Sequence, residues 1–242
     1  MHPAPPVDAT SDSELLPGSE QPMSPEGKMR RLLGANQFDP DERASLRPPL
    51  VAATVVLLIG FGIAEGIYRA SSGISFDLLK SHDLYWLYFS AVLLGWLTRF
   101  HNFFPGSLKN AAMRGRAKGN IRANMYLYTI AHEHDSNQEQ PLIVLEEGGA
   151  AGRYNRGNRS LHHFVENALP VYLHVPLAGV CFPVAAFVCT CFFCVGRVLH
   201  QVRYSNDGYG AHAPGFVVCI FASAILEGLV LVAALRGAGV LL

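Results

Sequence analysis

This sequence has little charge and no cysteine outside its apolar segments. Only 16% of its 242 residues are Asp, Glu, Lys or Arg, whereas 50% are hydrophobic. The position of all five cysteines in apolar segments argues against a disulfide framework and favours small apolar packing residues. No stretch is left over for a separate soluble globular domain, so the composition indicates a membrane protein.

The longest uncharged stretch separates Glu166 from Arg197. It exceeds the roughly 20 residues that one transmembrane helix needs, so we interpret it as two spans that turn near Pro183. Antiparallel arms of about 162–182 and 184–204 place both charges at a similar depth, because each helical residue adds about 1.5 Å. We therefore expect Glu166 and Arg197 to form a buried ion pair, and intramembrane ionisable residues are functional candidates.

Three further apolar segments are candidate spans: Leu50 to Tyr68, Leu84 to Thr98 and Phe216 to Leu235. A long polar stretch precedes the first segment, which is therefore not interpreted as a cleavable signal peptide. Glu65 lies near the end of that segment, where its side chain can reach the membrane surface. Glu227 lies in the middle of the last segment, so we expect it to face the bundle interior or the axis of a trimer.

The chain divides into three parts. Residues 1–48 are rich in Pro, Ser, Asp and Glu and are interpreted as a disordered cytosolic tail. Residues 49–70 are expected to form one added transmembrane helix. Residues 84–242 are expected to form a helical transmembrane domain with a long cytosolic loop at about 105–158. An apolar run from Leu142 in this loop is too short to span a membrane and is expected to pack on the bundle.

Positive charge is concentrated in two regions. Fourteen of the 19 Lys and Arg residues lie before Leu50 or between Arg99 and Arg159. If two spans separate these regions, both lie on one side, which the positive-inside rule identifies as the cytosol. The basic part of the loop, which includes Arg114 and Arg122, is interpreted as attracted to lipid headgroups rather than to nucleic acid.

Two motifs at the ends of the uncharged stretch carry polar residues with helical spacing. In RSLHHFVENALP these residues are four and three apart: Arg159, His163 and Glu166. In VGRVLHQVRY they are three and four apart: Arg197, His200 and Tyr204. Each set shares one helix face, so the two sets form a polar pocket if their faces meet. Such a pocket suits a ligand with carboxylate and ammonium groups, although the same residues could simply pair to hold the hairpin together.

The two motifs resemble the second-helix and third-helix segments of the membrane-associated proteins in eicosanoid and glutathione metabolism (MAPEG). The similarity covers roughly residues 84–236 and is closest to the microsomal glutathione transferase and prostaglandin E synthase branches. It implies an all-α, integral membrane, left-handed four-helix bundle, to which this chain adds one N-terminal transmembrane helix. It also implies a homotrimer in the endoplasmic reticulum or another internal membrane, with glutathione bound between subunits near the cytosolic face.

The resemblance also implies which residues contact glutathione. Four residues match family positions that bind it: Arg159, Glu166, Arg197 and Tyr204. His200 fits a position that is His or Tyr in the relatives, and Asn167 and Arg99 are further candidates. His163 stands where the family commonly has asparagine, and it can still donate a hydrogen bond.

One departure from the family concerns the thiol of glutathione. Many relatives carry an arginine in the loop before the last helix, where it stabilises the glutathione thiolate. The corresponding loop here contains Ala211 and His212 and has no arginine. His212 could substitute in part, but an imidazole with a pKa near 6.5 is mostly neutral at cytosolic pH. We therefore expect weak catalysis or none.

The resemblance implies a glutathione transferase or glutathione-dependent peroxidase that acts on lipophilic electrophiles, with the thiolate as the nucleophile. One alternative is a trimeric lipid-binding or scaffold member of the same family without catalysis. A second alternative is a membrane di-iron oxygenase that uses metal-capable residues such as His132, His134 and His162. The ordered histidine boxes of such oxygenases are absent from the sequence.

Overall fold

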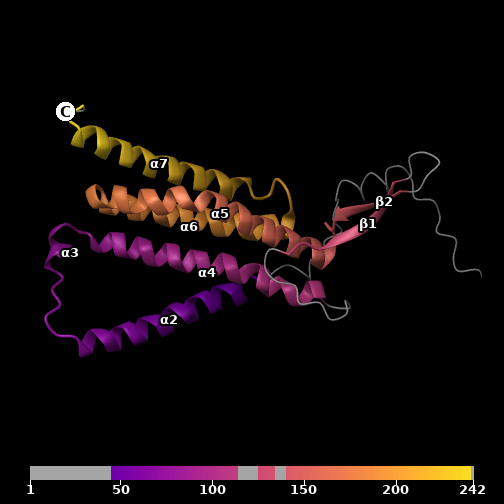
Figure 1. The fold of residues 1–242 in the computed structure, drawn as a ribbon, viewed down its shortest axis with the longest axis horizontal. Helices are drawn as coiled ribbons and strands as arrows, with labels where there is room; N and C mark the ends of the chain where they lie inside the picture. Colours follow the sequence, from indigo (N-terminus) through magenta and orange to yellow (C-terminus); the bar gives the residue numbers. More distant parts are fainter. Residues whose placement is uncertain (1–44, 114–124, 134–139, 241–242) are drawn as a thin grey trace, which may run out of the picture. The chain divides into compact units, whose positions relative to one another are not determined.

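The computed structural model describes residues 45–113, 125–133 and 140–240, which belong to one compact unit. In chain order the elements are α2 (Arg47–Ala70), α3 (Asp77–Ser81), α4 (Tyr85–Met113), β1 (Tyr128–Glu133), β2 (Gln140–Leu145), α5 (Gly149–Cys181), α6 (Pro183–Asp207) and α7 (Ala213–Gly237) (Figure 1). The predicted tail at residues 1–48 lies almost entirely outside the described residues.

Four of the described helices are long and apolar enough to cross a membrane, namely α2, α5, α6 and α7. The chain is thus an all-α, multi-pass membrane protein, as the sequence predicted. The expected span at Leu84 to Thr98 belongs to α4, which is not among these four. Tyrosines, tryptophans and Arg99 lower the hydropathy of α4, which nevertheless packs against α5 and α6 within the bundle.

The helical hairpin at the centre of the bundle is confirmed. α5 ends at Cys181, a single residue follows, and α6 begins at Pro183. Proline suits this position because the first N–H groups of a helix have no partner within the helix. α5 begins at Gly149, however, well before the predicted start near residue 162. The glycines that follow the apolar run from Leu142 form the start of this helix.

Glycine is required at the start of α5 because the backbone approaches itself closely there. A Cβ atom on Gly152 would lie 1.9 Å from the carbonyl oxygen of Glu147. Gly149 has a φ angle of +54°, in the left-handed region that glycine adopts most easily. These two positions explain how a glycine-rich stretch can begin a long helix.

The predicted loop at 105–158 contains regular structure that the sequence analysis missed. α4 continues to Met113, and β1 and β2 form an antiparallel hairpin in which Ile130 pairs with Ile143. The apolar run from Leu142 therefore forms a strand instead of packing on the bundle, and Ile143 is 77% exposed. The Asn155 amide nitrogen donates to the carbonyl oxygens of Leu127 and Glu146, which ties the base of the hairpin to α5.

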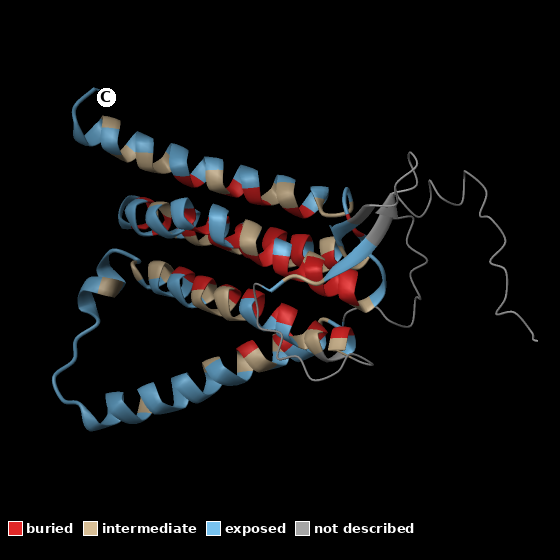
Figure 2. Ribbon diagram, turned by 45° about the vertical axis from the view of Figure 1, so that its right-hand side comes forward, coloured by how far each residue is buried: buried red, intermediate tan, exposed pale blue. Residues whose placement is uncertain are grey.

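The core of the bundle lies where α4, α5, α6 and α7 meet (Figure 2). α2 contributes little to it, because its only buried residues are Pro49 and Ala53. The indole nitrogen of Trp96 in α4 donates a hydrogen bond to the hydroxyl of Thr54 in α2. Beyond this contact α2 and α4 diverge (Figure 1). α2 is therefore a loosely attached helix beside a well-packed bundle, in agreement with the predicted extra helix.

Two glycines set the distance between α6 and α7. A Cβ atom on Gly215 would lie 2.6 Å from the carbonyl oxygen of Gly196 and 2.6 Å from the backbone nitrogen of His200. A Cβ atom on Gly196 would lie 2.8 Å from the sulfur of Cys219. The helices cross with their backbones nearly in contact, which brings the start of α7 against the face of α6 that carries His200.

Candidate functional site

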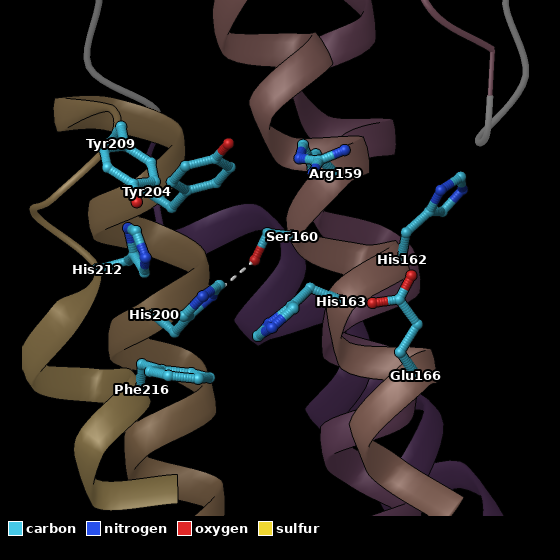
Figure 3. Close-up of a pocket in the computed structure, with 10 residues that line it drawn as sticks. All are labelled: Arg159, Ser160, His162, His163, Glu166, His200, Tyr204, Tyr209, His212 and Phe216. Atoms are coloured by element: carbon cyan, nitrogen blue, oxygen red, sulfur yellow. Dashed lines mark hydrogen bonds between the residues drawn. The ribbon is translucent and has the colours of Figure 1, made fainter. Parts of the chain in front are cut away.

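A cavity of about 250 Å³ lies between α5, α6 and the start of α7 (Figure 3). Its lining comprises Arg159, Ser160, His162, His163, Glu166, His200, Tyr204, Tyr209, His212 and Phe216. Six of the predicted site residues are in this lining: Arg159, His163, Glu166, His200, Tyr204 and His212. The polar faces of the two sequence motifs therefore meet, as their helical spacing predicted.

The rings of three histidines and a tyrosine form one wall of the cavity. The His163 and His200 rings stack with centroids 5.1 Å apart and planes 14° apart. His212 approaches His200 edge-on at 5.0 Å, and Tyr204 lies 5.1 Å from His212. Ser160 Oγ lies 3.0 Å from His200 Nδ1 and fixes the orientation of that ring. Donors and acceptors thus line a surface that is otherwise aromatic.

The charged groups of the cavity belong to α5, and α6 forms the other side of the cavity (Figure 3). Arg159 and Glu166 line the cavity, and both are exposed (Figure 3). An arginine can hold a carboxylate through two parallel hydrogen bonds, and a glutamate can accept hydrogen bonds from an ammonium group. The arrangement therefore suits a ligand that carries both groups.

The predicted ion pair between Glu166 and Arg197 is wrong. Glu166 is exposed, whereas Arg197 is 1% exposed and turns into the core. Its Nη1 lies 3.2 Å from His163 Nδ1, and its Nη2 donates to the Ser160 carbonyl oxygen at 3.3 Å. Its guanidinium also lies over the Phe164 ring. Helical spacing correctly placed Arg197 near the motif of α5, but it could not show that this residue lies behind the cavity wall.

Two further predicted contacts lie outside the cavity lining. Asn167 is exposed on α5, and its amide donates to the carbonyl oxygen of His163. Arg99 lies in α4, and its Nε is buried without a partner in the described part of the chain. Within one chain neither residue lines the cavity.

Four lining residues were not among the predicted site residues: Ser160, His162, Tyr209 and Phe216. Ser160 and His162 belong to the first motif, so their position in the sequence could have predicted that they line the cavity. Phe216 follows His212 by one helical turn and therefore shares its face. The ring of Tyr209 lies 5.5 Å from that of His212, a contact made by the loop that no periodic pattern indicates.

The electrostatic state of His212 bears on its suggested role at the thiol. Desolvation by burial lowers the pKa of His212 from its usual value of 6.5. The imidazole is therefore mostly neutral at pH 7 and can offer a hydrogen bond but no positive charge.

The described residues include no group of three or more His, Cys, Asp or Glu side chains placed to hold a metal ion. His134, which a di-iron site would use, lies outside the described residues, and for His132 only the backbone is described. Neither a protein-family model, nor a curated protein, nor a solved structure matches this chain.

Proposed function

We propose that this protein is a MAPEG-like membrane protein that binds glutathione and conjugates it to lipophilic electrophiles or uses it to reduce lipid hydroperoxides. The observation that supports the proposal is the meeting of both motifs in one cavity. Arg159 and Glu166 supply opposite charges there, and Tyr204 and His200 supply polar rings beside them. Glutathione matches this set because it carries two carboxylates, one ammonium group and two peptide groups.

In the proposed reaction the glutathione thiolate attacks an electrophilic carbon, a carbon–sulfur bond forms, and the leaving group departs with its electron pair. With a hydroperoxide, the thiolate attacks the terminal oxygen and the alkoxide that leaves takes up a proton. A second glutathione then converts the sulfenic acid to a disulfide and water. The protein contributes the orientation of the thiol beside the bilayer.

The size of the cavity favours a site that more than one subunit completes. Its volume of about 250 Å³ is slightly below the 300 to 1,000 Å³ that is usual for ligand sites. We therefore propose a homotrimer in which a neighbouring subunit closes the open side, where Asn167 of α5 is exposed. On the basis of the positive-inside rule and the resemblance, we propose that this end of the bundle faces the cytosol and that the protein lies in an internal membrane.

A second candidate function is that of a lipid-binding or scaffold protein without catalysis. The loop that would supply the guanidinium has Ala211 and His212 instead, and desolvation lowers the pKa of His212. The cavity could then present a fatty acid, with Arg159 holding its carboxylate, to a partner protein.

Titration of glutathione into the detergent-purified protein tests the proposal, with isothermal calorimetry as the measurement. Arg159→Ala should weaken binding by about tenfold or more, because hydrogen bonds to charged groups contribute about 1.5 to 3 kcal/mol. Arg69→Ala is the matched control, since Arg69 is exposed at the end of α2 and pairs with Glu65. Absence of glutathione binding combined with tight oleate binding would instead support the scaffold.

A further inference from the structure

The contact between α5 and α7 beside the cavity defines how these two helices are aligned. Both helices start at the same end of the bundle and run in the same direction (Figure 1). The ring of His163 in α5 lies 5.4 Å from the ring of Phe216 in α7. His174 and Glu227 each lie eleven residues farther along their respective helices. Eleven residues make about three turns and about 16 Å, so we expect His174 and Glu227 at a similar depth, on the sides of their helices that carry the two rings.

Buried residues of α5 and α7 contribute to the bundle core at this depth. Val175 and Leu226 belong to the same core cluster and are 2% and 0% exposed. His174, next to Val175, is half-buried, and Glu227, next to Leu226, is exposed. The two polar side chains thus lie next to core residues, on less buried sides of their helices.

Neither polar side chain has a hydrogen bond or ion pair within the described residues, although both lie within candidate membrane spans. A carboxyl group and an imidazole without partners in hydrocarbon are unfavourable, and such residues mark functional sites by default. Half-buried Ser223 lies one turn before Glu227 and adds a hydroxyl on the same side. A polar strip therefore continues from the cavity toward the middle of the membrane.

We propose that Glu227 and His174 form a second binding subsite for a lipid, which recognises a hydroxyl group in the middle of an acyl chain. The polar end of this lipid lies in the cavity, about 16 Å away along the helices. A hydroxyl suits the subsite because it donates to the carboxylate and accepts from an imidazole N–H. An unsubstituted chain would leave all these groups without partners. The inference rests on the proposed function, in which a lipophilic compound reacts beside the cavity, and it identifies that compound as a hydroxylated lipid.

The test compares ricinoleate with oleate, two fatty acids that differ only by a mid-chain hydroxyl, in equilibrium binding to the protein in nanodiscs. Wild type should bind ricinoleate about tenfold more tightly, as expected for hydrogen bonds to a charged group. Glu227→Leu and His174→Leu should abolish this preference and leave oleate affinity unchanged. Glu227→Gln, which keeps a donor and an acceptor, should retain most of it. Glu65→Leu is the matched control and should behave as wild type, since Glu65 lies in α2.

Equal affinity of wild type for the two fatty acids would overturn the subsite. Glutathione titrated into fatty-acid-free samples of the same proteins separates the two proposals, because normal glutathione binding without a hydroxyl preference contradicts the subsite alone. The oligomer mass of Glu227→Leu completes the test. A loss of oligomers without a change in lipid preference would show that Glu227 joins subunits, which also overturns the subsite.

Discussion

Among single residues, Ser160 has the clearest effect on the cavity. Its hydroxyl holds one nitrogen of His200, and its carbonyl oxygen accepts from Arg197, so it joins the wall of the cavity to the buried guanidinium behind it. Arg197 thereby positions the rings of the wall without lining the cavity itself. The charges offered to a ligand come from Arg159 and Glu166 alone among the described lining residues.

The lowered pKa of His212 predicts a pH dependence of stability. Well above pH 6.5 the His212 side chain is neutral in both the folded and the unfolded chain, so its protonation does not reduce the free energy of unfolding. As the pH falls toward the lowered pKa, the unfolded chain binds the proton more readily and stability is lost. The melting temperature of His212→Gln should therefore fall less than that of wild type between pH 7 and pH 5 in scanning fluorimetry. Parallel profiles for the two proteins would contradict this.

Restoring a guanidinium beside the thiol should increase catalysis. In Ala211→Arg a positive charge near the sulfur should lower the thiol pKa of bound glutathione, and opposite charges commonly shift a pKa by about 1 to 3 units. Thiolate absorbance and turnover of a lipophilic electrophile should rise about tenfold or more at pH 7. Ala211→Gln controls for side-chain size. An equal gain in both variants would show that charge is not the cause.

Among the elements, the α6–α7 crossing determines the shape of the cavity. The near-contact of Gly196 and Gly215 places the start of α7 so that Phe216 and His212 face His200. A residue with a side chain at either glycine would separate the helices and widen the cavity.

Gly215→Ala should therefore destabilise the protein by about 1 to 3 kcal/mol, the usual cost of overpacking, and weaken glutathione binding. Gly228→Ala is the matched control in the same helix, because a Cβ atom there meets nothing within 4 Å. Alanine favours helix over glycine, so this control should be neutral or slightly stabilising. Thermal unfolding and calorimetry check both variants, and similar behaviour of the two would contradict the role of the crossing.

The hairpin and the meeting of its motifs could be predicted from the sequence because both depend on local features. An uncharged run of that length requires a turn, and polar residues spaced three and four apart must share a face. The direction in which Arg197 points could not be predicted, because its contacts with His163, Ser160 and Phe164 join segments that are distant in sequence. The β1–β2 hairpin was missed for a similar reason, since the side chain of Asn155, distant from β1 in sequence, ties its base to α5.

For the whole molecule, the arrangement of the helices predicts which segments share a side of the membrane. The β hairpin, the start of α2 and the start of α7, which lines the cavity, lie toward one end of the bundle (Figure 1). The connection between α2 and α4 and the turn from α5 to α6 lie at the other end.

Cysteine labelling in sealed microsomes, whose cytosolic face is outside, tests this topology. A membrane-impermeant maleimide should label Thr129→Cys in β1 directly and Ser75→Cys only after permeabilisation. Both variants also carry Cys181→Ser, because Cys181 is exposed at the end of α5. Labelling of both positions in intact vesicles would contradict two separate sides, and the reverse pattern would contradict the proposed orientation.

The sparse contact between α2 and the bundle bears on how the protein is made. Helix α2 leaves the ribosome before any residue of the cavity, and earlier spans usually set the orientation of those that follow. Because α2 buries only Pro49 and Ala53, packing against later helices contributes little to its insertion. We therefore expect its flanking charges to determine its orientation in the membrane. In turn, we expect α2 to set the side of the membrane on which the cavity opens before the lining residues are synthesised.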